Sequence, residues 1–272
     1  MSVCITSLQN GRIKHVIKLN QRRYRVAARL TVVEGVREVS RALQHGVVPQ
    51  EAFVCPELLT AEADTAVSHL HTLAQQNHTQ LYEVTTAVFG KMAYRGDSGG
   101  LLITIPYLDT ALDNLVLSTV PLLVVIEGAE KPGNVGAILR TADGAGVDGV
   151  ILSSDGPSTD LHNPNVIRAS LGTLFSVGTA VAANAELITW LRQKDIQIVA
   201  AVPDAEVLYT AVNLARPTAI IVGSEAFGLS DTWLAAAQQQ VRIPMQGTAD
   251  SLNLSISVAI LVYEAIRQRQ IN

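Results

Sequence analysis

Residues 121–128, PLLVVIEG, are the stretch that most limits the fold. A half-buried strand alternates apolar and polar residues, whereas this stretch is apolar at consecutive positions. An uninterrupted apolar strand is typical of the centre of a parallel sheet whose two faces are both covered by helices. Further apolar runs follow at residues 149–153, 197–202 and 218–223. Because helical patterns separate them, they predict an α/β domain with an open, doubly wound parallel sheet.

The elements between these strands complete the predicted domain. Helices are expected at residues 135–145, 166–174, 186–194 and 231–239. A last short strand, VRIPM, precedes a glycine-containing turn, the polar loop Asp250-Ser251-Leu252-Asn253 and a long apolar helix. The first turns of that helix are crowded with serine and asparagine, which cap helices but also leave donors and acceptors facing outward.

The amino-terminal part has a second alternation of strands and helices. Strands are expected at 30–35, 51–56, 80–84 and 101–107, and helices at 36–46, 61–77 and 85–93. Residues 10–29 are polar and basic, and they predict a helix and an exposed turn. This pattern indicates a small α/β domain over residues 1–107, a linker over 108–119 and the parallel-sheet domain over 120–272.

Composition narrows the class of protein further. With 48% hydrophobic and 16% charged residues, the chain is expected to be globular and ordered. Cys4 and Cys55 fit no metal-ligand spacing, and neither do His69 and His71, so no metal is expected. No apolar run reaches the roughly 20 residues that span a bilayer, and no secretory signal pattern is present, so a cytoplasmic protein is expected.

Basic residues are concentrated near the amino terminus, although the net charge of the chain is −4. A cluster of this kind is usually the solvated face of a helix, but it also matches the phosphate-contacting surface of an RNA-binding protein. The composition leaves both interpretations open. The basic residues of the cluster are Arg12, Lys14, Lys18, Arg22, Arg23, Arg25, Arg29, Arg37 and Arg41.

Three segments share one design, in which a strand leads into a polar loop. They span residues 126–152, 219–230 and 241–270. Each alone has a simpler interpretation, such as a capped helix or a carboxylate at a helix start. The dinucleotide fingerprint G-x-G-x-x-G is absent after the first strand, which argues against a nicotinamide-dependent oxidoreductase. Together, the three loops can line one pocket.

In order and spacing these segments resemble the three signature motifs of the SpoU family of SPOUT RNA ribose 2′-O-methyltransferases. The resemblance covers residue 121 to the carboxyl terminus. It implies a deep trefoil knot, which residue patterns alone do not predict, and S-adenosylmethionine as the cofactor. It also implies a homodimer, with the pockets near the interface, and a structured RNA substrate, with ribosomal RNA favoured and transfer RNA an alternative.

The resemblance also implies roles for particular residues. The catalytic set is Asn134, Arg140, Glu225, Ser251 and Asn253. The cofactor set is Gly223, Ser224, Gly228, Ile243, Met245 and Leu252. The amino-terminal domain resembles the small RNA-binding domain that precedes many SpoU enzymes, which would place Arg22, Arg23 and Arg25 near RNA phosphates. Glu225 is expected to brace Asn134 or Arg140.

Arg140 is the residue that the resemblance marks as essential, and its chemistry has two interpretations. A guanidinium has a pKa above about 12 and no acceptor while protonated, so it is a poor general base. It either deprotonates transiently beside the substrate or only holds a phosphate and stabilises the developing alkoxide. A catalytically silent, ribosome-associated RNA-binding protein of the same fold is the competing function.

Overall fold

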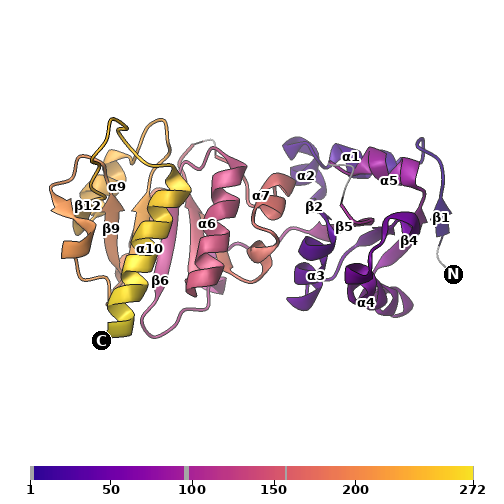
Figure 1. The fold of residues 1–272 in the computed structure, drawn as a ribbon, viewed down its shortest axis with the longest axis horizontal. Coiled ribbons are helices and arrows are strands. Elements are labelled where there is room, and N and C mark those ends of the chain that lie inside the picture. The colour runs from indigo at the N-terminus through magenta and orange to yellow at the C-terminus, as the bar shows by residue number, and fades with distance from the viewer. Residues whose placement is uncertain (1–2, 95–97, 157, 272) are drawn as a thin grey trace. The chain divides into compact units, whose positions relative to one another are not determined.

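The computed structural model describes residues 3–94, 98–156 and 158–271. The chain forms two compact units (Figure 1). The amino-terminal unit comprises Met1–Leu108 and, after a gap in the sequence, Asp160–Ser176. The carboxy-terminal unit comprises Asp109–Thr159 and Val177–Asn272. The chain therefore passes between the units three times, whereas the predicted domains were continuous stretches.

The amino-terminal unit is built on a five-stranded mixed sheet. Its strands are β1 (Val3–Ile5), β2 (Leu30–Glu34), β3 (Glu51–Val54), β4 (Gln80–Val84) and β5 (Leu101–Pro106), in the order β1-β4-β3-β5-β2. The last strand, β5, runs antiparallel to both of its neighbours. The helices are α1 (Gly11–Lys18), α2 (Arg22–Ala28), α3 (Val36–Gln44), α4 (Asp64–Gln75), α5 (Thr86–Met92) and α7 (Pro164–Ala169).

The returning segment Asp160–Ser176 is held within the amino-terminal unit by polar contacts. The carboxylate of Asp160 accepts a hydrogen bond from Arg25 at 2.9 Å, and the carbonyl of Leu171 accepts one from Arg41 at 2.8 Å. The ring of His162 stacks on Tyr107 with the centroids 3.7 Å apart. Burial lowers the pKa of His162 to about 4, so this imidazole is neutral at physiological pH.

The carboxy-terminal unit contains a seven-stranded sheet in which every pairing is parallel. The strand order is β10-β12-β9-β11-β6-β7-β8. The strands are β6 (Leu122–Glu127), β7 (Gly149–Ser153), β8 (Gly178–Ala182), β9 (Gln197–Ala201), β10 (Val207–Leu208), β11 (Thr218–Val222) and β12 (Gln239–Arg242). The helices are α6 (Pro132–Ala145), α8 (Asn184–Gln193), α9 (Asp231–Ala236) and α10 (Leu254–Ile271). The predicted α/β class with a parallel sheet is confirmed.

Strand β6 is buried along its whole length, as its uninterrupted apolar sequence predicts. Because neighbouring side chains of a strand point to opposite faces, alternate residues enter different layers. Leu123 and Val125 belong to a core cluster that also contains Leu187 of α8 and Trp233 of α9. Helices α6 and α10 lie side by side (Figure 1) and cover the sheet through β7 and β11.

Several predicted boundaries differ from the structure. The short strands β1, β8 and β10 were not predicted, and α6 begins at Pro132 instead of residue 135. Helix α7 ends at Ala169 because Leu171 and Gly172 have φ values of 54° and 81°. Helix α9 ends at Ala236, and residue 239, predicted as the end of this helix, belongs to strand β12 because it pairs with β9. Tertiary pairing overrides helix propensity here.

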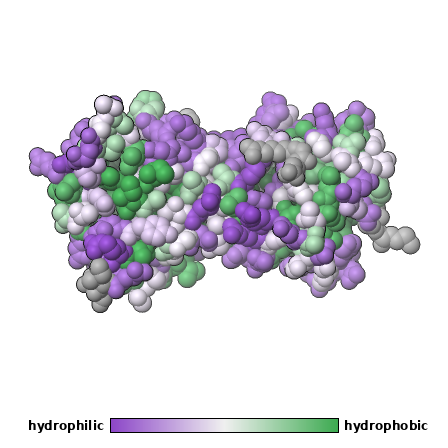
Figure 2. All heavy atoms as spheres, in the orientation of Figure 1, coloured by the Kyte–Doolittle hydropathy of each residue, from purple (hydrophilic) through white to green (hydrophobic). Residues whose placement is uncertain are grey.

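Helix α10 has 18 residues and carries apolar side chains on most of its surface. Val258, Leu261 and Val262 are buried, whereas Ile256 and Tyr263 are 51% and 52% exposed. In Figure 2, hydrophobic residues gather on the visible face of this unit, near the amino-terminal half of α10. Among the described residues, no helix combines the length and apolarity needed to cross a bilayer.

The chain reaches α10 from β12 through residues 243–253, which contain neither helix nor strand. The pairing of β12 with β9 and β10 places this connection at the side of the sheet away from β6. The trefoil knot implied by the family resemblance depends on how the connection is threaded, and it stays a prediction.

Candidate functional site

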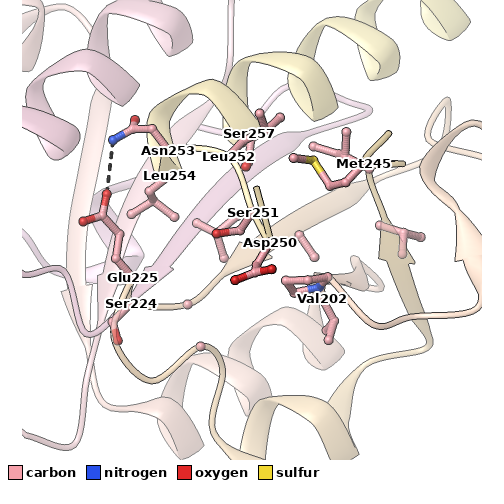
Figure 3. Close-up of a pocket in the computed structure, with 17 residues that line it drawn as sticks. Val202, Ser224, Glu225, Met245, Asp250, Ser251, Leu252, Asn253, Leu254 and Ser257 are labelled. Atoms are coloured by element: carbon pink, nitrogen blue, oxygen red, sulfur yellow. Dashed lines mark hydrogen bonds between the residues drawn. The ribbon is translucent and has the colours of Figure 1, made fainter. Parts of the chain in front are cut away.

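A cavity of about 450 Å³ lies in the carboxy-terminal unit, where strands β9, β11 and β12 end (Figure 3). Ligand sites of α/β sheets are found at the carboxyl ends of parallel strands. The loop before α10 forms the remaining wall. The lining residues are Ala201, Val202, Pro203, Val222, Gly223, Ser224, Glu225, Gly228, Val241, Ile243, Met245, Asp250, Ser251, Leu252, Asn253, Leu254 and Ser257.

One wall of the cavity is the tight turn Ser224–Gly228. Ser224 and Gly228 exchange two backbone hydrogen bonds, at 3.2 and 3.0 Å, and Gly228 has a φ of 68°. A Cβ atom on Gly223 would lie 2.1 Å from the carbonyl carbon of Gly228. Glycine is therefore required at position 223, because any side chain would push this turn out of place.

A buried polar network supports the far end of the same turn. The carboxylate of Glu127, at the end of β6, accepts hydrogen bonds from the backbone and hydroxyl of Ser230 at 2.8 and 2.7 Å. It also accepts one from the side chain of Asn184 at 2.7 Å. The oxygen of Asn184 in turn accepts from Ser153 and Trp233. Each of these contacts satisfies a buried polar group and fixes the start of α9.

A cluster of polar side chains lies at the edge of the cavity. Asn134 donates a hydrogen bond to the Oε1 atom of Glu225 at 2.9 Å. Asn253 donates to the same oxygen at 3.1 Å (Figure 3) and to the side-chain oxygen of Asn134 at 3.2 Å. Lys131 forms an ion pair with the other oxygen of Glu225. The cluster thus joins α6, the turn after β11 and the start of α10.

The electrostatics of the cluster keep Glu225 ionised. Hydrogen bonds from Lys131 and Asn134 lower the pKa of Glu225 below its ordinary value, and the contact with Glu225 raises the pKa of Lys131. A carboxylate that is charged throughout the physiological range can only accept hydrogen bonds. Glu225 therefore orients the two asparagine amides.

Asn253 also determines how α10 begins. Its Oδ1 atom accepts hydrogen bonds from the backbone and the hydroxyl of Ser255, at 3.0 and 2.7 Å. This is the hydrogen-bonding pattern of a helix cap. The same amide therefore caps α10 with its oxygen and enters the polar cluster with its nitrogen.

Most of the predicted residues of this unit come together. The predicted cofactor residues Gly223, Ser224, Gly228, Ile243, Met245 and Leu252 all line the cavity, as do Glu225, Ser251 and Asn253. Asn134 joins them through its hydrogen bonds. Within the described ranges, no three His, Cys, Asp or Glu side chains are gathered in a way that could hold a metal ion.

Arg140 does not join this group. Six residues turn an α-helix through about 600°, so Arg140 points well away from Asn134 on α6. It is exposed and shares a helical face with Gly144, where an added Cβ would lie 3.5 Å from the hydroxyl of Tyr263 on α10. Arg140 makes no hydrogen bond or ion pair with the part of the chain that the structure describes.

The three predicted RNA-contacting arginines have different surroundings in the amino-terminal unit. Arg25 is only 2% exposed, and its guanidinium donates to the carbonyls of Leu19 and Asn20 and to Asp160. It therefore holds the fold together and has no free surface for a phosphate. Arg22 and Arg23 are exposed at the start of α2.

The structure adds cavity residues that the sequence analysis did not assign. Val202 and Pro203 follow β9, and Ser257 lies in the first turn of α10. Asp250 belongs to the predicted polar loop, but no role was assigned to it. Lys131 enters through its ion pair with Glu225. The position of Val202 and Pro203 could have been found from the rule that parallel strands place their ligand sites at their carboxyl ends. The Lys131 contact spans 94 residues of sequence and left no local signal.

Comparison with known proteins agrees with this architecture. The model of the SpoU rRNA Methylase family matches residues 121–263, and that of the MRM3-like substrate binding domain matches residues 10–102. An uncharacterized tRNA/rRNA methyltransferase of Synechocystis sp. is 32% identical over 269 residues, covering 97% of this chain and 94% of the relative.

Solved structures resemble the whole chain. An RNA 2′-O ribose methyltransferase has a TM-score of 0.83 and 42% identity, covering 98% of this chain and 100% of the other. The SpoU methyltransferase AviRb from Streptomyces viridochromogenes, solved with the cofactor AdoMet, has a TM-score of 0.85 and 26% identity, covering 97% and 100%. The chain therefore belongs to the SpoU rRNA methylase family, and it is an RNA 2′-O-methyltransferase of that family.

Proposed function

We propose that this enzyme transfers a methyl group from S-adenosylmethionine to a ribose 2′-hydroxyl of ribosomal RNA, and that the transfer takes place at the cavity of the carboxy-terminal unit. The observation that carries the proposal is the convergence of three sequence segments on one cavity. Asn134, Glu225 and Asn253 come from separate segments, yet they form one hydrogen-bonded cluster at its edge.

The cavity has the properties that the cofactor requires. Its volume of about 450 Å³ lies within the range of small-molecule sites, roughly 300–1,000 Å³. Val202, Ile243, Met245 and Leu252 offer apolar surface to an adenine ring, and the turn after Gly223 leaves backbone groups accessible. Asp250 and Glu225 bring carboxylates that suit a positively charged ligand. When bound, S-adenosylmethionine supplies an electrophilic methyl group on a sulfonium.

The polar cluster supports catalysis by positioning. Methyl transfer requires in-line approach of the hydroxyl oxygen, and fixed geometry accounts for a large part of the rate of such reactions. Glu225 orients the amides of Asn134 and Asn253, and Ser251 lies beside them in the cavity wall. These groups would fix the ribose by hydrogen bonds. Glu225 itself is not assigned as the base, because its pKa is lowered.

We propose that the enzyme is a homodimer and that Arg140 contacts the RNA and not the cofactor. Arg140 is exposed one turn before Gly144, and Gly144 lies beside Tyr263 of α10. On α10, Ile256 and Tyr263 are about half exposed. A second copy that covers this face would bury those side chains, and a twofold arrangement would bring each Arg140 towards the partner's cavity. There, a guanidinium would hold a phosphate and stabilise the developing alkoxide.

Mixing inactive variants tests this arrangement. Arg140→Ala and Asn134→Ala subunits should each be inactive alone. If Arg140 serves the partner's cavity, mixed dimers contain one intact site, so an equimolar mixture should recover about a quarter of the wild-type activity. A mixture that stays inactive while the subunits exchange would contradict the shared site, and a monomer in sedimentation experiments would contradict the dimer.

Ribosomal RNA is the favoured substrate because the matching family model is that of rRNA methylases and a relative from Streptomyces viridochromogenes is a 23S rRNA 2′-O-methyltransferase. We also infer that the reaction takes place in the cytoplasm. The amino-terminal unit would bind the RNA, with Arg22 and Arg23 as phosphate contacts. Transfer RNA stays the alternative, since the Synechocystis relative is described as a tRNA/rRNA methyltransferase.

The test is transfer of labelled methyl to unmodified ribosomal RNA and, separately, to transfer RNA, with the product mapped by nuclease digestion and mass spectrometry. One 2′-O-methylated position in ribosomal RNA is expected. Asn134→Ala is the matched site variant, because its amide serves only the cluster, whereas Asn253 also caps α10. Methylation of transfer RNA alone would show that transfer RNA, and not ribosomal RNA, is the substrate. Absence of cofactor binding in calorimetry would contradict the assignment of the cofactor to this cavity.

A further inference from the structure

The amino-terminal unit presents an aromatic ring that its fold does not bury. Tyr94 follows α5 and is 59% exposed. The guanidinium of Arg168, near the end of α7, lies over this ring at 4.3 Å from its centroid. We call these two side chains the Tyr94–Arg168 platform. A single exposed tyrosine on a protein surface needs no explanation, so its surroundings decide whether it has a role.

Both halves of the platform are held in place. The backbone N–H of Tyr94 donates a hydrogen bond to the carboxylate of Glu34 at 2.8 Å. The guanidinium of Arg168 donates to the side-chain oxygen of Asn165, one turn earlier on α7. One face of the ring is therefore covered by a fixed cation, while more than half of the side chain stays accessible. A preorganised surface loses little entropy when a ligand stacks on it.

The charges around the platform are mostly positive. Helices α3 and α7 both pack on β2, which ends at Glu34. Burial raises the pKa of Glu38 on α3, and the charges of Arg37, Arg168 and Arg41 oppose that rise. Arg41 is engaged with the carbonyl of Leu171, whereas Arg37 is exposed on α3. Strand β2 and helices α3 and α7 together carry three arginines, Arg37, Arg41 and Arg168, and two carboxylates, Glu34 and Glu38. The surface thus combines an exposed ring with an excess of arginine.

We propose that the Tyr94–Arg168 platform stacks one unpaired base of the substrate RNA, with Arg37 contacting a neighbouring phosphate. Proteins recognise single-stranded RNA by stacking its splayed bases on aromatic rings and guanidinium planes. A base-paired helix offers no free base face, so the platform selects a loop, bulge or opened segment. This inference rests on the proposed function, and it adds a contact surface distinct from Arg22 and Arg23.

Substitution of Tyr94 in the full-length enzyme separates stacking from charge. Tyr94→Leu keeps an apolar side chain but removes the ring, whereas Tyr94→Phe keeps the ring and serves as the matched control. Loss of one stacked base weakens binding by roughly 5- to 150-fold. We expect Tyr94→Leu to weaken binding of the methylated RNA fragment about tenfold, with S-adenosylmethionine affinity unchanged, and Tyr94→Phe to stay within about twofold of wild type.

The salt dependence gives a second, independent measurement. Log Kd against log salt concentration should keep its slope in Tyr94→Leu, because no phosphate contact is lost. The slope should fall by about one in Arg37→Gln, which removes one phosphate contact. The thermal midpoint should not change in either variant, since both side chains are exposed. Should Tyr94→Leu be unstable, ultraviolet crosslinking of the wild-type protein to 4-thiouridine RNA should still label Tyr94.

Two outcomes would overturn the platform. RNA affinity of a folded Tyr94→Leu enzyme within twofold of wild type would show that no base stacks there. Equal losses in Tyr94→Phe and Tyr94→Leu would show that the hydroxyl matters and the ring does not. Failure of the proposed function looks different, because the wild-type enzyme would then methylate no RNA. The platform is tested only against the RNA that the wild type methylates.

Discussion

Substitution of Glu225 distinguishes a bracing carboxylate from a catalytic acid or base. Its Oε1 atom accepts from both Asn134 and Asn253, at 2.9 and 3.1 Å, and its Oε2 atom forms the ion pair with Lys131. Glutamine in the same rotamer can keep its oxygen towards the asparagines, while the exposed ammonium of Lys131 moves away from the NH2 group into solvent. Glu225→Gln therefore loses the ion pair alone, whereas Glu225→Ala leaves two amides without their acceptor.

The structure sets the size of both effects. Lys131 is 65% exposed in its side chain, and an ion pair exposed to this degree contributes at most about fivefold to an equilibrium constant. We expect kcat/KM of Glu225→Gln to stay within about fivefold of wild type, and Lys131→Ala to match it. Glu225→Ala should lose about 100-fold, mostly in kcat, because misdirected amides cost transition-state geometry.

The assay is steady-state methyl transfer to the mapped RNA, with S-adenosylmethionine affinity measured by calorimetry. The double variant Lys131→Ala, Glu225→Gln should be no slower than either single variant, since both remove one interaction. Because the pKa of Glu225 is lowered, protonation of this carboxylate should not limit the wild-type rate at physiological pH. A 1,000-fold or greater loss of kcat/KM in Glu225→Gln would refute the bracing role. Glutamine keeps the acceptor oxygen but cannot take up or release a proton, so such a loss would show that the carboxylate acts as an acid or base.

The remaining predictions concern the turn, the histidine and the arginine. In Gly223→Ala the added Cβ would lie 2.1 Å from the carbonyl carbon of Gly228, so calorimetry should show at least tenfold weaker cofactor binding. Unchanged affinity would show that the turn moves aside without affecting the cavity. His162 has a folded pKa of about 4, below the unfolded value of about 6.5, so its stabilisation is complete above pH 6.5 and is lost as the pH falls towards 4. Urea unfolding should show a loss of about 2 kcal/mol between pH 7.5 and 5 that His162→Gln lacks; equal slopes in both proteins would contradict this. Arg140→Ala should abolish transfer with cofactor affinity within a few-fold, and parallel loss of cofactor binding would move Arg140 to the cofactor side.

The cavity could be predicted from sequence because its residues follow strands that are recognisable locally. Gly223, Glu225 and Asn253 each lie within a strand-to-loop segment, and parallel strands place such loops at one edge of a sheet. Of the polar cluster, only one contact was predicted, in which Glu225 braces Asn134 or Arg140. In the structure Glu225 accepts a hydrogen bond from Asn134 and none from Arg140. Arg140 lies six residues further along α6, so its side chain points in a different direction from that of Asn134.

Contacts between residues far apart in the sequence account for the features that local sequence patterns did not predict. Arg25 belongs to a basic cluster, and its burial depends on Asp160, which is 135 residues away. Local charge patterns do not reveal such a partner. Strand β8, with the sequence GTAVA, is short and carries no strong signal of its own. It forms because β7 offers it a paired edge, which is a tertiary effect.

The return of Asp160–Ser176 to the amino-terminal unit restricts how this chain can be divided or recombined. These residues lie inside the stretch that matches the SpoU family model, yet their hydrogen bonds are made to Arg25, Thr31 and Arg41. A gene cut in the region 108–119 would separate the buried guanidinium of Arg25 from the carboxylate of Asp160, and a buried charge without a partner is strongly destabilising. Chimeras that exchange RNA specificity between related enzymes should therefore carry residues 160–176 together with the amino-terminal unit.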